Sequence, residues 1–138
     1  MKKTLILITF FLSLFINKLS AQSTSKAATF PTTSIGMVIY SNDVETIWNA
    51  LRLANFSKNA GDTVSVFLLG KGVELDNLVK ENANLKEQSD KFLKSGGVIL
   101  GCGTCLVQRK NNEPQVCKFS SLADLYALIR KNKTVLTF

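Results

Sequence analysis

Residues 63–69 are Thr63-Val64-Ser65-Val66-Phe67-Leu68-Leu69, a short and almost uninterrupted apolar run. Such a run predicts a strand that is buried on both faces, as in a parallel sheet covered by helices. Glycine ends the segment on each side, at Gly61 before it and in Gly70-Lys71-Gly72 after it. The strand is therefore expected to stop at residue 69 and to be followed by a tight turn.

Elements of alternating type surround this strand. Apolar runs predict further strands, and apolar residues at helical spacing predict helices between them. The predicted order is a strand at 36–40, a helix at 43–59, the strand at 63–69, one or two short helices within 75–95, a strand at 98–101, a helical turn at 102–109, a helix after Ser121 and a strand at 134–138. This alternation predicts an α/β fold with a mainly parallel sheet and helices on both of its faces.

The helix at 43–59 has one apolar face, and Trp48 on that face is expected to pack in the core. Asn42, with Glu45 three residues later, fits the capping-box pattern and is expected to begin this helix. Ser121 is expected to be the N-cap of the last helix, because a serine hydroxyl can accept a hydrogen bond from a backbone N–H of the first turn.

The first 21 residues have the features of a secretory signal peptide. Lys2 and Lys3 precede an apolar run at 4–16, and Leu19-Ser20-Ala21 is a plausible cleavage site. An uncleaved membrane anchor is the alternative, but the run is shorter than the roughly 20 residues that a span needs. We therefore predict a signal peptide at 1–21, a flexible tether at 22–34, a domain at 35–138, export to the periplasm, and no stable membrane insertion after cleavage.

Composition excludes several functional classes. The chain has no histidine, which excludes Ser-His-Asp and Cys-His catalysis and histidine-based zinc sites. Three cysteines are too few for a four-cysteine metal site, and Leu75 stands where a dinucleotide fingerprint needs its third glycine, so no metal or cofactor is expected. Loss of residues 1–21 would lower the net charge from +7 to +4, and the remaining basic residues are scattered among acids, so no nucleic acid partner is expected.

A Cys-x-x-Cys motif, Cys102-Gly103-Thr104-Cys105, follows the predicted strand at 98–101. Ligand sites of open α/β sheets lie at the carboxyl ends of the strands. In a helical turn Cys105 could face the same way as Cys102, and Arg109 could share that face and favour a thiolate or an anionic sulfur species. The alternative is that Cys102 is a small buried residue and Arg109 a surface charge. A thioredoxin-like site is a poor fit, because neither Pro31 nor Pro114 is placed to face the sulfurs.

The chain resembles the DsrE/DsrF-like family over residues 36–138. The matching segments, in order, are 38–43, 48–55 and 64–74, then Cys102-Gly103-Thr104-Cys105-Leu106, Arg109 and 135–138. The resemblance implies a three-layer α/β/α sandwich around a mostly parallel sheet of four to five strands. It also implies a sulfur-handling role in which Cys102 carries sulfur as a persulfide. Cys105 belongs to a Cys-x-x-Cys subset of relatives, and the family commonly assembles as trimers or hexamers.

Three functions remain open at this stage. In the first, Cys102 accepts sulfur from a donor protein or a small sulfur compound, Cys105 resolves the persulfide and Arg109 supports the anion. In the second, the domain is a non-catalytic module that binds a ligand or a subunit and has a structural Cys102–Cys105 disulfide. In the third, the pair exchanges disulfides with exported proteins. Whether the protein is an enzyme is left undecided, and Cys117 has no assigned role.

Overall fold

The computed structural model describes residues 30–138. The predicted signal peptide at 1–21 and most of the predicted tether at 22–34 lie outside the described residues. Residues 31–138 form one compact unit. Its helices, within the described residues, are too short or too polar to cross a membrane.

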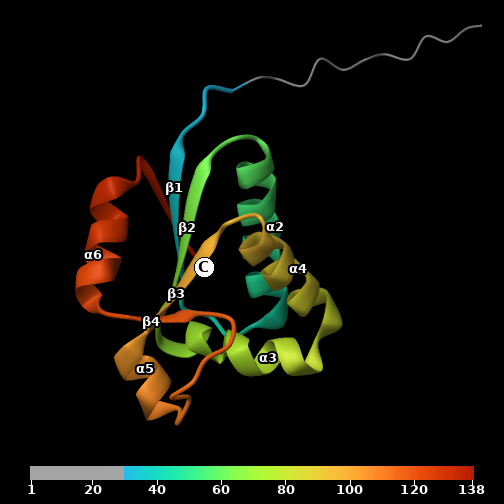
Figure 1. Ribbon diagram of the computed structural model, residues 1–138, viewed down its shortest axis with the longest axis vertical. Coiled ribbons are helices and arrows are strands. Elements are labelled where there is room, and N and C mark those ends of the chain that lie inside the picture. The colour runs from blue at the N-terminus through green and yellow to red at the C-terminus, as the bar shows by residue number, and fades with distance from the viewer. Residues whose placement is uncertain (1–29) are drawn as a thin grey trace, which may run out of the picture. The chain divides into compact units, whose positions relative to one another are not determined.

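A five-stranded, all-parallel sheet forms the centre of this unit (Figure 1). The strand order is β4-β3-β2-β1-β5, and each neighbouring pair is parallel. The bounds are β1 Ser34–Ile39, β2 Thr63–Leu68, β3 Val98–Cys102, β4 Lys118–Ser120 and β5 Thr134–Thr137. Because all strands point the same way, all their carboxyl ends meet at one edge of the sheet.

Helices cover both faces of the sheet, with α2 and α4 on one side and α6 on the other (Figure 1). The helices are α2 Val44–Asn59, α3 Leu75–Glu81, α4 Ala83–Lys94, α5 Gly103–Gln108 and α6 Leu122–Lys131, with a 3₁₀ turn, η1, at Gly70–Glu74. The predicted α/β fold with three layers is therefore confirmed. The predicted four to five strands resolve to five.

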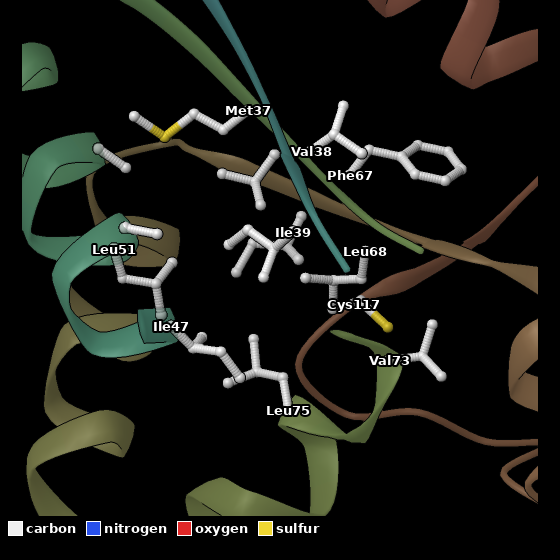
Figure 2. Close-up of a cluster of buried hydrophobic side chains, with 14 of the residues drawn as sticks. Met37, Val38, Ile39, Ile47, Leu51, Phe67, Leu68, Val73, Leu75 and Cys117 are labelled. Atoms are coloured by element: carbon white, nitrogen blue, oxygen red, sulfur yellow. The ribbon is translucent and has the colours of Figure 1, made fainter. Parts of the chain in front are cut away.

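The main core lies between the sheet and α2. Met37 and Ile39 alternate along β1 and are fully buried, and they lie on the same side as Ile47 and Leu51 of α2 (Figure 2). On the other face, β1 approaches α6 closely, because a Cβ built at Gly36 would lie 2.5 Å from Leu128 Cδ2. The sequence thus places large residues on one face of β1 and a glycine at position 36 of the other face, where α6 comes closest.

Two local predictions need correction. The N-cap of α2 is Asp43, whose carboxylate accepts from the Thr46 backbone N–H at 2.8 Å, so the predicted Asn42–Glu45 capping box is wrong. The carboxylate of Asp43 accepts from the Thr46 hydroxyl as well, at 2.7 Å, which makes it the better cap. The strand β4 was not predicted as an element. The predicted cap Ser121 is confirmed, and it forms a complete capping box with Asp124.

Trp48 is only partly buried, although it packs against the core as predicted. The guanidinium of Arg52 lies 4.3 Å from the centre of its ring. One face of the indole is therefore covered by a cation, which is a favourable arrangement for an aromatic ring.

Candidate functional site

Three chain segments meet at the carboxyl edge of the sheet. Asn42 follows β1, the η1 turn follows β2, and Cys102 ends β3. Because β1, β2 and β3 are adjacent and parallel, their ends lie side by side. This is the edge at which open α/β sheets place their ligand sites.

Cys102 and Cys105 form a close pair at this edge. Cys102 is the N-cap of α5, and Cys105 lies in the first turn of that helix, so the predicted helical turn brings both sulfurs together. Their side chains are close enough for Cys102 to raise the pKa of the Cys105 thiol by hydrogen bonding, and both are free thiols. Cys102 is 6% exposed, whereas Cys105 is half-buried. The more accessible sulfur is thus the second one of the motif.

The surroundings of Cys105 favour its thiol form. Burial raises the pKa of the Cys105 thiol, and its hydrogen bond with Cys102 raises it further. The backbone N–H of Gly70, which hydrogen bonds to the Cys105 sulfur, and the charge of Arg109 act in the opposite direction on this pKa. The thiol form of Cys105 is therefore favoured over its thiolate.

Arg109 lies beside the pair but is engaged by a carboxylate. Its Nε donates to Glu74 Oε1 at 2.9 Å, and its Nη1 donates to the carbonyl oxygen of Cys105 at 3.3 Å. The structure therefore brings all three predicted site residues to one place. The Arg109 charge is shared between Glu74 and the cysteine pair.

Glu74 is a member of this site that the sequence did not single out. Its second carboxylate oxygen accepts from Asn42 Nδ2 at 2.8 Å. The hydrogen bond from Arg109, and then the one from Asn42, hold the pKa of the Glu74 carboxyl below its usual range. Glu74 is 32 and 35 residues from its two partners, so no local spacing could have revealed the contact.

The chain matches one family over the whole of this fold. A family profile described as the DsrE/DsrF-like family matches residues 34–138. The chain belongs to the DsrE/DsrF-like family. The resemblance that the strand-end segments and the Cys-x-x-Cys motif indicated is thereby confirmed.

Solved structures show the same fold for proteins distant in sequence. The YchN protein of E. coli superposes with a TM-score of 0.65 at 17% identity, covering 78% of this chain and 100% of that chain. A conserved protein of unknown function from Bacteroides thetaiotaomicron superposes with a TM-score of 0.64 at 18% identity, covering 77% of this chain and 95% of that one. Among curated proteins, none matches this chain.

The third cysteine of this DsrE/DsrF-like protein is not part of the pair. A Cβ built at Gly101 would lie 2.6 Å from the Cys117 sulfur, so Cys117 packs directly against the backbone of β3. It belongs to the same buried core cluster as Val73 and Leu68 (Figure 2). Because successive residues of a strand point to opposite faces, Cys117 lies on the face opposite to the Cys102 side chain. Burial raises the pKa of Cys117 to about 11, and the Asp76 carboxylate adds to this.

Asp76 holds the segment that carries Cys117. It is 3% exposed, and its Oδ1 accepts from the backbone N–H groups of Gln115 and Val116, both at 2.7 Å. Its Oδ2 accepts from Asn111 Nδ2 at 3.2 Å. The sequence signalled neither Asp76 nor these partners, because they are 35 to 40 residues apart.

Within residues 30–138, no group of three or more cysteine, aspartate or glutamate side chains is arranged to hold a metal ion.

A cavity of about 400 Å³ opens beside the Glu74–Arg109 ion pair, and Leu78 and Glu81 also line it. At the carboxyl end of β3, the structure therefore offers the adjacent thiols of Cys102 and Cys105, with the Gly70 N–H and the Arg109 guanidinium beside them.

Proposed function

We propose that this protein handles sulfur by carrying it as a persulfide on Cys102. Membership of the DsrE/DsrF-like family indicates a sulfur-related role, and the family profile covers the whole described fold. The observation that carries the proposal is the thiol pair at the carboxyl end of β3, in which Cys105 hydrogen bonds to Cys102. A thiol donating to a neighbouring sulfur stabilises that neighbour as a thiolate, which is the reactive form.

The first step is attack by the Cys102 thiolate on the outer sulfur of a persulfide, polysulfide or thiosulfate donor. A new S–S bond forms at Cys102 and the donor's S–S bond breaks, so that the donor leaves as a thiolate, a shorter polysulfide or sulfite, respectively. The terminal sulfur on Cys102 then bears a negative charge near neutral pH. Gly70 N–H and Arg109 are the described groups that can stabilise negative charge beside the pair.

Transfer can then follow one of two routes. A thiolate of an acceptor takes the terminal sulfur, and Cys102 returns to a thiolate. Otherwise, the Cys105 thiolate attacks the Cys102 sulfur and expels hydrosulfide, which leaves a Cys102–Cys105 disulfide. An external dithiol must then reduce that disulfide before another cycle.

Loading with sulfur tests this proposal. Reduced protein is incubated with polysulfide and, separately, with thiosulfate, and its intact mass is measured. At early times, before Cys105 expels the added sulfur, we expect the wild type to gain one sulfur atom and Cys102→Ser to gain none. Cys117→Ser, the matched control, should load like the wild type. An unmodified wild type, or equal loading after Cys102→Ser, would refute the proposal.

The burial of Cys102 favours a second candidate, a binding module in which the two cysteines form a structural disulfide. At 6% exposure Cys102 has little open surface for a donor. In that case Cys102 would be alkylated only on unfolding, and the disulfide would have a very low reduction potential. A potential near those of cellular oxidants would favour thiol–disulfide exchange instead.

We also propose that the protein is exported to the periplasm, on the strength of the sequence pattern at residues 1–21. Detection in the periplasmic fraction, with a mass matching cleavage after Ala21, is the expected result. In that compartment the resting state of the pair depends on the local supply of reductant.

A further inference from the structure

The Glu74 carboxylate joins segments that follow three different elements. It accepts from Arg109 Nε, just after α5, at 2.9 Å, and from Asn42 Nδ2, just after β1, at 2.8 Å. Glu74 itself ends the η1 turn that follows β2. The side chains of Arg109 and Glu74 are 28% and 32% exposed, so this ion pair is partly shielded from solvent. Charge-assisted hydrogen bonds of this kind are about twice as strong as neutral ones.

The η1 turn also carries the N–H group that reaches the cysteine pair. Gly70 begins the turn with a φ of 55°, a backbone conformation that glycine adopts without strain, and its N–H approaches the Cys105 sulfur closely enough to lower the pKa of that thiol. Gly72 in the middle of the turn lies against β1, because a Cβ there would be 2.1 Å from the Ile39 carbonyl oxygen. The position of the Gly70 N–H therefore depends on how the whole turn is held.

Arg109 holds the other side of the contact. Its Nη1 donates to the Cys105 carbonyl oxygen, so the same guanidinium that binds Glu74 also holds the turn of α5 that carries the sulfur. Glu74 thus ends the turn that carries the Gly70 N–H, and Arg109 binds both Glu74 and the turn of α5 that carries the Cys105 sulfur.

We propose that Glu74 is a positioning residue of the cysteine pair, whose bonds to Arg109 and Asn42 hold the Gly70–Glu74 turn so that the Gly70 N–H stays on the Cys105 sulfur. This inference rests on the proposed function only in assigning sulfur chemistry to the pair. The charged and titratable groups that act here are Cys102 and Arg109 beside Cys105, and Arg109 and Lys71 beside Glu74.

Loss of Glu74 has two effects of opposite sign on the thiols. Removing a negative charge near the pair favours the thiolate and lowers the apparent pKa. Displacing the Gly70 N–H removes a hydrogen bond to the thiolate and raises that pKa. If Glu74 is a positioning residue, the rise in pKa from displacing the Gly70 N–H should exceed the fall from removing the charge when the hydrogen bonds of Glu74 to Arg109 and Asn42 are lost.

Two substitutions separate these effects. Glu74→Gln removes the charge but keeps an oxygen that accepts from Arg109, and its NH2 can donate to the Asn42 side-chain oxygen once that amide flips. Glu74→Ala removes both the charge and the hydrogen bonds to Arg109 and Asn42. The matched control is Glu81→Ala, because Glu81 lines the same cavity and carries the same charge, but its carboxylate makes no hydrogen bond or ion pair among residues 30–138.

The readout is the rate of iodoacetamide alkylation of reduced Cys102 and Cys105, followed against pH by peptide mass spectrometry. We expect Glu74→Ala to raise the apparent pKa of the pair by about half a unit to one unit, which slows alkylation below that pKa by roughly three- to tenfold. Glu74→Gln is expected to leave it unchanged or lower it, and Glu81→Ala to leave it unchanged.

Equal shifts in Glu74→Ala and Glu74→Gln, or a lowered pKa in Glu74→Ala, would overturn the inference. If Glu74→Ala does not fold, Asn42→Ala takes its place, with a smaller rise expected and no rise contradicting the inference. Alkylation needs no sulfur donor, so its outcome is independent of persulfide loading. A wild type that loads no sulfur would refute the proposed function while leaving this test intact.

Discussion

The three cysteines differ in their environments more than in their chemistry. Cys102 ends a strand, Cys105 lies in the first turn of α5, and Cys117 packs in the core against Gly101. Thiol reactivity follows from the thiolate fraction and from access. The sequence could place the first two at a strand end, because an apolar run leads directly into them. It gave no information about Cys117, whose neighbours come from distant segments.

Cys117 is expected to be inert in the folded protein. Burial raises its pKa to about 11, so almost none of it is thiolate at pH 8. Timed alkylation with iodoacetamide at pH 8 should modify Cys102 and Cys105 in the folded protein and Cys117 only after denaturant is added. Modification of Cys117 at the rate of Cys105 in native buffer would contradict this description of the core.

Glu74 shows which site residues sequence reasoning misses. Arg109 could be predicted, because it stands four residues after Cys105 on a short helix. Glu74 could not, because its partners become neighbours only when three parallel strands end at one edge of the sheet. The distance in sequence, rather than the residue type, hides this contact.

At the scale of elements, the sequence predicted the regular helices and the buried strands well. The apolar runs at β1, β2, β3 and β5 agree with the observed strands to within two residues at each end. The three-residue β4 escaped prediction, because Lys118 and Phe119 are exposed at the sheet edge and give no apolar pattern. The cap of α2 was misplaced by one residue, since Asn42 binds Glu74 instead and leaves the cap to Asp43.

The segment between α5 and β4 depends on Asp76, because its carboxylate accepts hydrogen bonds from the backbone of Gln115 and Val116. Asp76→Ala leaves these part-buried N–H groups without their carboxylate partner and should lower the free energy of unfolding by about 2 kcal/mol. Urea denaturation measures this change. The control is Asp90→Ala, which removes only an exposed pair with Lys86 and should change stability by less than about 0.5 kcal/mol. Equal effects of the two variants would contradict the role of Asp76.

At the scale of the whole molecule, the two faces of the sheet are covered unequally. Two long helices pack on one face, and α6 alone packs on the other (Figure 1). The helix α6 buries Leu128 but exposes Leu122, Tyr126 and Ile129, which lie on one side of it at helical spacing. Exposed apolar groups at this density are typical of surfaces that meet another protein.

Self-association is the whole-molecule prediction, since the family resemblance implies trimers or hexamers. Light scattering at micromolar concentration should give a mass of several chains, and Tyr126→Lys should reduce it. Phe56→Lys is the control, because Phe56 is equally exposed but lies on α2, on the other face of the sheet. A single-chain mass for the wild type, or the same loss in both variants, would contradict this prediction.

The central claim, that Cys102 carries sulfur and Cys105 removes it, is tested most directly by Cys105→Ser. Without the resolving thiol, a persulfide on Cys102 cannot be expelled as hydrosulfide from within the pair. After polysulfide treatment and removal of excess donor, peptide mass spectrometry should find one extra sulfur on Cys102, with a longer lifetime than in the wild type. Sulfur on another residue, or no retained sulfur in Cys105→Ser, would contradict the account.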